Sequence, residues 1–262
     1  MIGKILLGST DILVSRIGLG TVKFGRNEKV NYPEKFLLPD DKTILELLAL
    51  AKNLGINLLD TAPAYGSSEE RLGSLLKGQR QDWILSTKVG EEFENGHSYF
   101  DFSPTAVQAS VQRSLKRLGT DYLDIVLVHS SGEDKKIIEQ DQVFETLKEI
   151  KKAGLIRAYG MSTKTVEGGL LAIDQSDLVM VTHNLQYDAE RSVIQYASQK
   201  QKGVFIKKAL ASGHFSADTS TDPVSDAMKF IFNEPGVSSV IIGTLNPEHL
   251  SHNVFCAEQA LL

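Results

Sequence analysis

The sequence has only one cysteine, Cys256, among its 262 residues. A single thiol excludes an internal disulfide, and chains without disulfides are typical of a reducing compartment. The 28 basic residues are outnumbered by 33 acidic ones, so the sequence offers no basic footprint for a nucleic-acid backbone. No apolar run approaches the roughly 20 residues of a membrane helix. We therefore expect a cytoplasmic protein with no nucleic-acid or membrane partner.

Short apolar runs rich in Val, Ile and Leu alternate with longer segments of helical periodicity, a pattern typical of βα units around a parallel sheet. The runs cover residues 17–19, 57–60, 83–88, 123–129, 158–161, 178–182, 204–207 and 239–242. The helical segments include residues 41–53, 104–118, 142–152 and 222–233. Eight strands interleaved with helices in a chain of this length predict one (β/α)8 TIM barrel domain over residues 1–262.

An open, doubly wound sheet is the alternative to a barrel. Such sheets usually carry G-x-G-x-x-G after the first strand, and the nearest run here, GLGTVKFG, has the wrong spacing. Ahead of the first barrel strand, residues 4–8 and 13–17 flank a polar turn and predict an N-terminal β-hairpin that could close the barrel floor. Residues 25–40 are polar with two prolines, and we expect a loop there on the catalytic face.

Polar or ionisable residues follow the apolar runs in LLDTAPAYG, ILSTKVG, IVLVHSSG and AYGMST. In a barrel, the carboxyl ends of all strands meet at one mouth, where this fold carries its chemistry. We therefore predict that four residues from neighbouring strands form one active site there: Asp60, Tyr65, Lys88 and His129.

The residue types suggest a role for each of the four. Asp60 and Lys88 would each be costly to bury alone, so we expect an ion pair. A fixed ammonium beside Tyr65 would lower the phenol pKa and make it a usable proton donor. His129 could hydrogen-bond the substrate oxygen or merely cap its strand. The structural alternatives are an Asp that caps a turn, a Tyr packed at the rim and a Lys that reaches solvent.

Several longer segments resemble the aldo-keto reductase superfamily: LLDTAPAYGSSEERLG, STKVG, SLKRLGTDYLDIVLVHS, GLIRAYGMS and SSVIIGTLNPEHLSHN. The resemblance covers nearly the whole chain. It implies that Asp60, Tyr65, Lys88 and His129 are the catalytic tetrad of that family. It also implies reduction of a small aldehyde or ketone to an alcohol by hydride transfer from NADPH, with Tyr65 protonating the oxygen.

The resemblance further implies a cofactor site. Ser162 stands where the family binds the nicotinamide carboxamide, while Thr163 and Met180 replace the usual Asn and Gln. Lys207 or Lys208 stands in place of a stacked aromatic residue and either pairs with the pyrophosphate or reaches solvent. The other expected contacts are Gly20, Thr21, Asn184, Leu210, Gly213, Gly243, Thr244, His249, His252 and Asn253.

The segment that starts at Gly243 resembles the site for the adenosine 2′-phosphate, because a helix N-terminus there offers backbone N–H groups. We therefore expect NADPH rather than NADH. His249 and His252 share a helix face, but two ligands without a third partner make a poor zinc site, so we expect no metal. Three aromatic residues could form pocket walls or pack as ordinary loop residues: Tyr32, Phe36 and Tyr99.

Two other functions are compatible with these residues. The family also contains channel-associated proteins with slow turnover, so the altered carboxamide site suggests a nicotinamide-binding sensor or accessory subunit. A barrel lyase or isomerase would instead use Lys88 to form a Schiff base, with Tyr65 as an acid. No feature of the sequence indicates an oligomeric state.

Overall fold

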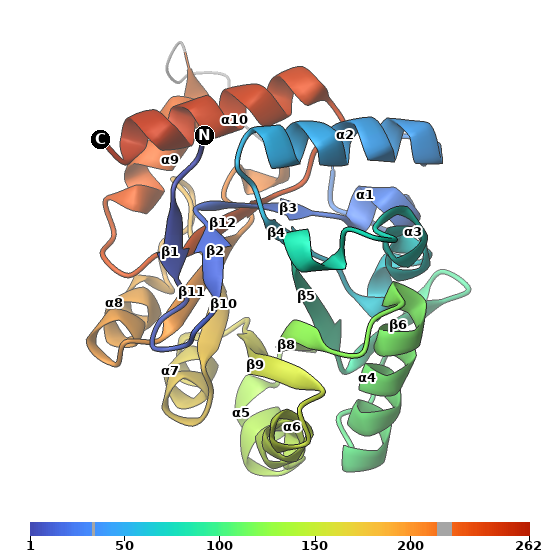
Figure 1. Ribbon diagram of the computed structural model, residues 1–262. Coiled ribbons are helices and arrows are strands. Elements are labelled where there is room, and N and C mark those ends of the chain that lie inside the picture. The colour runs from blue at the N-terminus through green and yellow to red at the C-terminus, as the bar shows by residue number, and fades with distance from the viewer. Residues whose placement is uncertain (33–34, 214–221) are drawn as a thin grey trace.

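Eight parallel strands close into a barrel in the computed structural model, which describes residues 1–32, 35–213 and 222–262. The strands follow chain order around the barrel, and the last pairs with the first (Figure 1). They are β3 (Ile17–Gly20), β4 (Leu58–Asp60), β5 (Ile84–Val89), β8 (Leu123–His129), β9 (Ile156–Ser162), β10 (Leu178–Thr182), β11 (Gly203–Lys207) and β12 (Ser239–Ile242). The predicted (β/α)8 barrel is therefore confirmed.

Helices surround the strands on the outside of the barrel (Figure 1). They are α1 (Val22–Gly25), α2 (Asp41–Asn53), α3 (Ser68–Leu75), α4 (Pro104–Leu118), α5 (Asp134–Glu139), α6 (Val143–Lys152), α7 (Val166–Gln175), α8 (Arg191–Gln199), α9 (Pro223–Phe232) and α10 (Pro247–Ala260). The described ranges also contain 3₁₀ turns: η1 (Pro63–Tyr65), η2 (Arg80–Asp82) and η3 (Ala211–Gly213). Within the described ranges, no helix combines the length and apolar character that crossing a membrane requires.

Helix boundaries follow from capping residues. The predicted helices 41–53 and 104–118 have the expected bounds. Each begins directly after an N-cap residue, Asp40 or Ser103, whose side chain accepts a backbone N–H of the first turn. The prediction 142–152 was wrong at its first residue, and the prediction 222–233 was wrong at both ends, since α9 ends at Phe232 and Asn233 is its C-cap. Gln142 has a left-handed backbone with φ of 53°, and Asp222 is the N-cap of α9 rather than its first residue.

The predicted N-terminal hairpin is present as β1 (Lys4–Leu6) and β2 (Leu13–Ser15). Its apolar side chains Leu7, Ile12 and Val14 join the cluster of side chains inside the barrel, so the hairpin closes the amino-terminal end. A second hairpin, β6 (Glu91–Glu94) and β7 (His97–Phe100), follows β5 and was not expected from the sequence. Of the predicted loop 25–40, Gly25 instead ends α1, residues 26–32 and 35–40 form the loop, and residues 33 and 34 lie outside the described residues.

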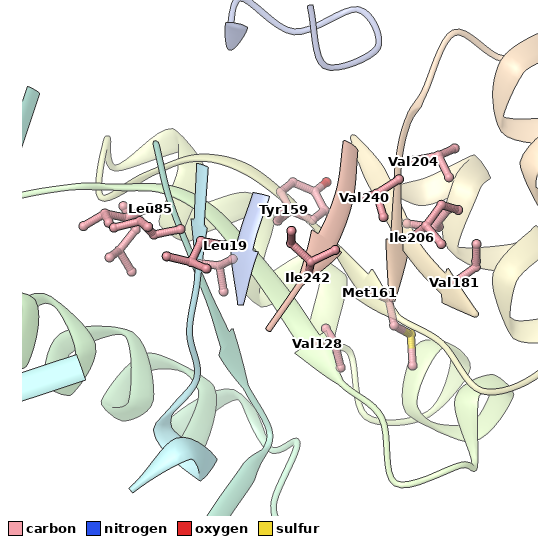
Figure 2. Packing of buried hydrophobic residues seen from close by; sticks show 14 of the residues in the cluster. Leu19, Leu85, Val128, Tyr159, Met161, Val181, Val204, Ile206, Val240 and Ile242 are labelled. Carbon is pink, nitrogen blue, oxygen red and sulfur yellow. The ribbon is translucent and has the colours of Figure 1, made fainter. Parts of the chain in front are cut away.

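Two apolar layers lie on either side of the strands. The outer layer packs strand residues such as Leu19, Val128 and Ile206 against the helices (Figure 2). The inner layer fills the barrel with side chains from alternate positions, for example Leu58, Leu127 and Phe205. Since a strand alternates its side chains between two faces, the residue two positions beyond an inner one also points inward.

This alternation brings the polar strand ends into the barrel mouth. Asp60 comes two positions after Leu58, His129 two after Leu127 and Lys207 two after Phe205. Lys88 and Ser162 follow the inner residues of β5 and β9 by four positions, which preserves the same face. The apolar filling of the barrel therefore forms the floor beneath these five polar side chains.

Candidate active site

Asp60 and Lys88 form a buried ion pair at the barrel mouth, as expected. Lys88 Nζ donates to Asp60 Oδ2 at 2.7 Å and to the Thr61 carbonyl oxygen at 2.9 Å. Asp60 Oδ1 accepts from Ser86 Oγ at 3.1 Å. Burial disfavours the ammonium, but Asp60, with a smaller contribution from Tyr65, outweighs burial and raises the pKa of Lys88. The side chain is therefore a fixed cation at neutral pH.

Tyr65 lies against this cation at the end of η1. Lys88 Nζ is 4.8 Å from the centre of the Tyr65 ring, and the Tyr65 and His129 rings meet edge to face at 6.2 Å. The backbone of η1 packs closely against the end of α1, because a Cβ on Gly25 would lie 2.4 Å from the Tyr65 carbonyl oxygen. Tyr65, Lys88 and His129 are thus held beside one another.

The expected fall in the Tyr65 pKa was wrong in its net direction. Burial raises the pKa of Tyr65, and the charge of Lys88 acts in the expected direction but does not outweigh it. The reason is that removing water destabilises a phenolate more than one neighbouring ammonium stabilises it, since that ammonium is already shared with Asp60. Tyr65 is therefore a protonated phenol at neutral pH, with a cation beside it that assists loss of the proton.

His129 has a carboxylate partner that the sequence did not indicate. Its Nδ1 lies 2.8 Å from Glu91 Oε2 on β6, although the ring N–H is poorly aligned with that oxygen. Burial lowers the pKa of His129, and Glu91 opposes this shift. Burial also acts on Glu91, but the contacts with His129, Ser98 and Arg26 outweigh it and lower the pKa of Glu91 to about 2. Because a carboxylate only accepts hydrogen bonds, this contact requires a proton on Nδ1.

A cavity of about 1440 Å³ opens above these residues and continues across the barrel mouth. Its wall contains all four residues of the predicted site and every residue of the predicted cofactor site. Tyr32 and Phe36 also line it, whereas Tyr99 is exposed on β7 away from the cavity. The cavity is larger than the few hundred Å³ typical of sites for a single small ligand.

Lys207 occupies the part of the cavity nearest Ser162. Its Nζ donates to Ser162 Oγ at 2.9 Å and to the Thr163 carbonyl oxygen at 2.6 Å. Because Lys207 supplies the proton of the first bond, the Ser162 hydroxyl keeps its own proton for an acceptor in the cavity. Burial lowers the pKa of Lys207 to about 8. Lys208 also lines the cavity, but its side chain is exposed.

Thr163 supports this arrangement rather than pointing a donor into the cavity. Its hydroxyl donates to Glu190 Oε1 at 3.2 Å, and Glu190 Oε2 accepts from the Thr182 backbone N–H at 2.9 Å. Asn184 binds its own loop, donating to the Lys208 carbonyl oxygen and accepting from the Gln186 backbone N–H. An amide has two N–H groups and two lone pairs, so Asn184 retains capacity for a further partner.

The far end of the cavity contains Gly243, Thr244, His249 and Asn253. The expected free backbone N–H groups of the helix are partly used, because Asn246 Oδ1 accepts from the N–H groups of residues 248 and 249. Asparagine is a strong N-cap, so these two backbone N–H groups are already occupied by the cap. Leu210 and Gly213 line the same cavity from the loop after β11.

Gly20 and Thr21 stand close to the ion pair. Gly20 pairs with Asp60 in the barrel register, and Thr21 Oγ1 donates to the Asp60 carbonyl oxygen at 3.0 Å. Thr21 also contacts Ser68 Oγ at 2.9 Å, which ties β3 and β4 to the start of α3. Thr21 is therefore a buried support for Asp60.

Sequence reasoning missed three buried or half-buried carboxylates: Glu91, Asp134 and Glu190. Glu91 had a signal, because it is an ionisable residue just beyond the carboxyl end of β5. Asp134 accepts from the backbone N–H groups of Lys164 and Thr165 in the loop after β9. Neither Asp134 nor Glu190 follows an apolar run, so no pattern identified them.

Comparisons with known proteins agree with this geometry. The model of the aldo/keto reductase family matches residues 16–226. The aldo-keto reductase YhdN of Bacillus subtilis is 33% identical over 214 residues, which cover 79% of this chain and 62% of YhdN, less than two thirds of its length. The uncharacterised oxidoreductase YqkF of the same organism is 35% identical over 96% of this chain and 90% of YqkF.

Among solved structures, the chain superimposes with a TM-score of 0.90 on PA4992 from Pseudomonas aeruginosa, which is named as an aldo-keto reductase. It is 52% identical, over 99% of this chain and 95% of PA4992. The chain belongs to the aldo/keto reductase family. It is accordingly an NAD(P)H-dependent oxidoreductase.

The contact between Glu91 and His129 leads to a test by NMR. In Glu91→Gln the carboxylate that stabilises the imidazolium is gone, so the already lowered pKa of His129 should fall further, by about one unit or more. The Hε1 resonance, assigned with His129→Gln, reports this pKa. Glu92→Gln is the matched control, since Glu92 is the next residue of β6 and contacts Arg113 instead. An unchanged or higher pKa of His129 in Glu91→Gln would contradict the assigned contact.

Proposed function

We propose that this protein reduces a small aldehyde or ketone to an alcohol with NADPH, and that Tyr65 is the proton donor. The observation that carries the proposal is the buried pair of Asp60 and Lys88 beside Tyr65 in a cavity that also contains Ser162 and Lys207. A protonated phenol, a fixed cation and a large cavity beside them are what carbonyl reduction requires of the protein.

Each of the four residues has a separate task. Tyr65 transfers its phenolic proton to the carbonyl oxygen as that oxygen gains negative charge. Lys88 stabilises the resulting phenolate, and Asp60 keeps Lys88 charged and in place. The Nδ1 proton of His129 is directed to Glu91, so a hydrogen bond from its second nitrogen to the carbonyl oxygen requires the imidazolium, the form that Glu91 favours against burial. Proximity within the cavity lowers the entropic cost of bringing these groups together.

The residues of the cavity fit a nicotinamide dinucleotide. Ser162 offers a hydroxyl proton to a carboxamide oxygen, and Lys207 brings a positive charge to the same region. Gly243 lets the chain pass close to Tyr32, since a Cβ there would lie only 3.1 Å from the Tyr32 hydroxyl. Thr244, His249 and Asn253 can contact the adenosine end. When bound, the reduced nicotinamide supplies the hydride that the carbonyl carbon requires.

The two alternative functions make different demands on these residues. A Schiff base needs a neutral amine, but Asp60 raises the pKa of Lys88 and keeps it an ammonium, which disfavours a lyase or isomerase of that kind. A sensor with little turnover is favoured by one observation, the Thr163 hydroxyl bound to Glu190 instead of facing the cavity. Turnover therefore decides between reductase and sensor.

Replacing Tyr65 by Phe tests the reductase directly. We expect consumption of NADPH with a panel of small aldehydes to fall by roughly 10²- to 10⁴-fold, because the general acid is lost, while NADPH binding is retained. Tyr99→Phe is the matched control, since Tyr99 is an exposed tyrosine outside the cavity. Equal turnover in wild type and Tyr65→Phe would contradict the proton donor. Tight NADPH binding by a wild type without turnover would indicate the sensor.

Preference for NADPH over NADH is a separate proposal. It rests on His249, an exposed cavity residue beside Thr244 at the end of β12. We expect fluorescence titration to give tighter binding of NADPH than of NADH, and His249→Ala to reduce the difference roughly tenfold, the effect of losing one hydrogen bond to a charged group. His97→Ala, at an exposed position on β7, should change nothing. Equal affinity of the wild type for both cofactors would refute this assignment.

A further inference from the structure

Three side chains of different chemistry converge where α9 begins beside α10. Asp222 is the N-cap of α9, while His252 and Cys256 lie one turn apart on α10. Residues four positions apart share one face of a helix, so the imidazole and the thiol both point to Asp222. His252 Nε2 is 3.2 Å from Asp222 Oδ1 and 3.5 Å from Cys256 Sγ, and Cys256 Sγ is 3.7 Å from Asp222 Oδ2.

We propose that Asp222, His252 and Cys256 bind a divalent metal ion, and that Zn²⁺ is the ion they fit best. Zinc is bound by carboxylate oxygen, imidazole nitrogen and thiolate sulfur at about 2.0–2.3 Å in a tetrahedral arrangement. Those bond lengths and angles separate neighbouring ligand atoms by about 3.3–3.7 Å. The separations of 3.5 Å between His252 and Cys256 and 3.7 Å between Cys256 and Asp222 fall in this range, and the 3.2 Å between His252 and Asp222 is slightly shorter. The two Asp222 contacts use different carboxylate oxygens, so one oxygen must approach both partners when the metal binds.

The donor set also discriminates between metals. One sulfur, one nitrogen and one oxygen suit a borderline-soft ion, whereas Mg²⁺ and Ca²⁺ prefer oxygen ligands alone. In the sequence, His249 was the one other candidate metal ligand that could be associated with His252. In the folded chain two other ligands join His252, and His249 is not part of the group.

Capping of α9 does not compete with this site. Asp222 Oδ1 accepts the Ser225 backbone N–H at 3.1 Å, and a carboxylate oxygen can accept a hydrogen bond and bind a metal at the same time. The cap orients the carboxylate, as second-shell partners of metal ligands commonly do. Ser225 thus supports Asp222 in the position that the ion requires.

The site would hold its metal through three protein ligands and one open position. Cys256 is buried, whereas the His252 and Asp222 side chains are 47% and 36% exposed, so a water molecule can complete the tetrahedron. Asp222 and His252 both line the large cavity near Asn253. On binding, a bond forms between the metal and Cys256 Sγ, and the thiol proton passes to solvent. This inference does not depend on the proposed reductase activity.

Titration of the chelator-treated protein with Co²⁺ tests the site. We expect one Co²⁺ per chain, with intense visible bands of tetrahedral cobalt and a near-ultraviolet band from thiolate charge transfer, both abolished by added Zn²⁺. Cys256→Ser should remove the charge-transfer band. His252→Ala, at an exposed position that tolerates truncation, should weaken Zn²⁺ binding at least tenfold.

His249→Ala is the matched control, because it removes an exposed histidine one turn earlier on α10 that is not one of the three ligands. Its cobalt spectrum and Zn²⁺ affinity should equal those of the wild type. Absence of the charge-transfer band in the wild type, or its persistence in Cys256→Ser, would overturn the proposal. Zn²⁺ affinity that His252→Ala leaves unchanged, or that His249→Ala weakens equally, would also overturn it.

Discussion

The ion pair between Asp60 and Lys88 is the interaction on which the rest of the site depends. Both side chains are buried, and removing two charges from water has a cost that only close contact and additional hydrogen bonds offset. Here the 2.7 Å contact is joined by hydrogen bonds from Ser86 and to the Thr61 carbonyl oxygen. Removing either partner would leave an uncompensated buried charge, at a cost of about 3–5 kcal/mol. The pair therefore defines one permitted arrangement of the barrel mouth.

The pair also gives the neighbouring phenol its chemical character. Burial disfavours ionisation of Tyr65 and raises its pKa, and the charge of Lys88 opposes that shift. His129 shows the same balance with opposite sign, since burial disfavours its imidazolium and Glu91 favours it. In both cases a low-dielectric site makes one nearby charge decisive.

The sequence was sufficient to predict the barrel and the convergence of the four polar residues, because both follow from alternation along buried strands. Asp60, Lys88 and His129 end apolar runs, and their common face follows from a two-residue period. The partners that come from loops were not predictable in this way. Glu190 and Asp134 reach the site only through the path of the loops after β8 and β10, and the Asp222 cluster requires contact between two helices.

The sign of the Tyr65 pKa shift was likewise beyond the sequence. The sequence pattern indicates which charged residues are neighbours in the barrel mouth. The free-energy cost of ionising a buried phenol depends on how much water the folded mouth excludes. The same argument applies to Lys207, whose pKa of about 8 reflects its burial more than the carboxylate of Glu190. Depth of burial is a property of the closed barrel, with its hairpin and apolar floor.

The central claim, that Asp60 keeps Lys88 charged so that Tyr65 can act as an acid, is tested most directly by the pH dependence of hydride transfer in Asp60→Asn. Asp60 raises the pKa of Lys88, so removing its charge lowers that pKa, and the ammonium is lost at lower pH. The account predicts that the alkaline fall of the single-turnover rate moves to lower pH by about one unit or more, with NADPH binding retained. An alkaline limb that stays in place or moves to higher pH would contradict it.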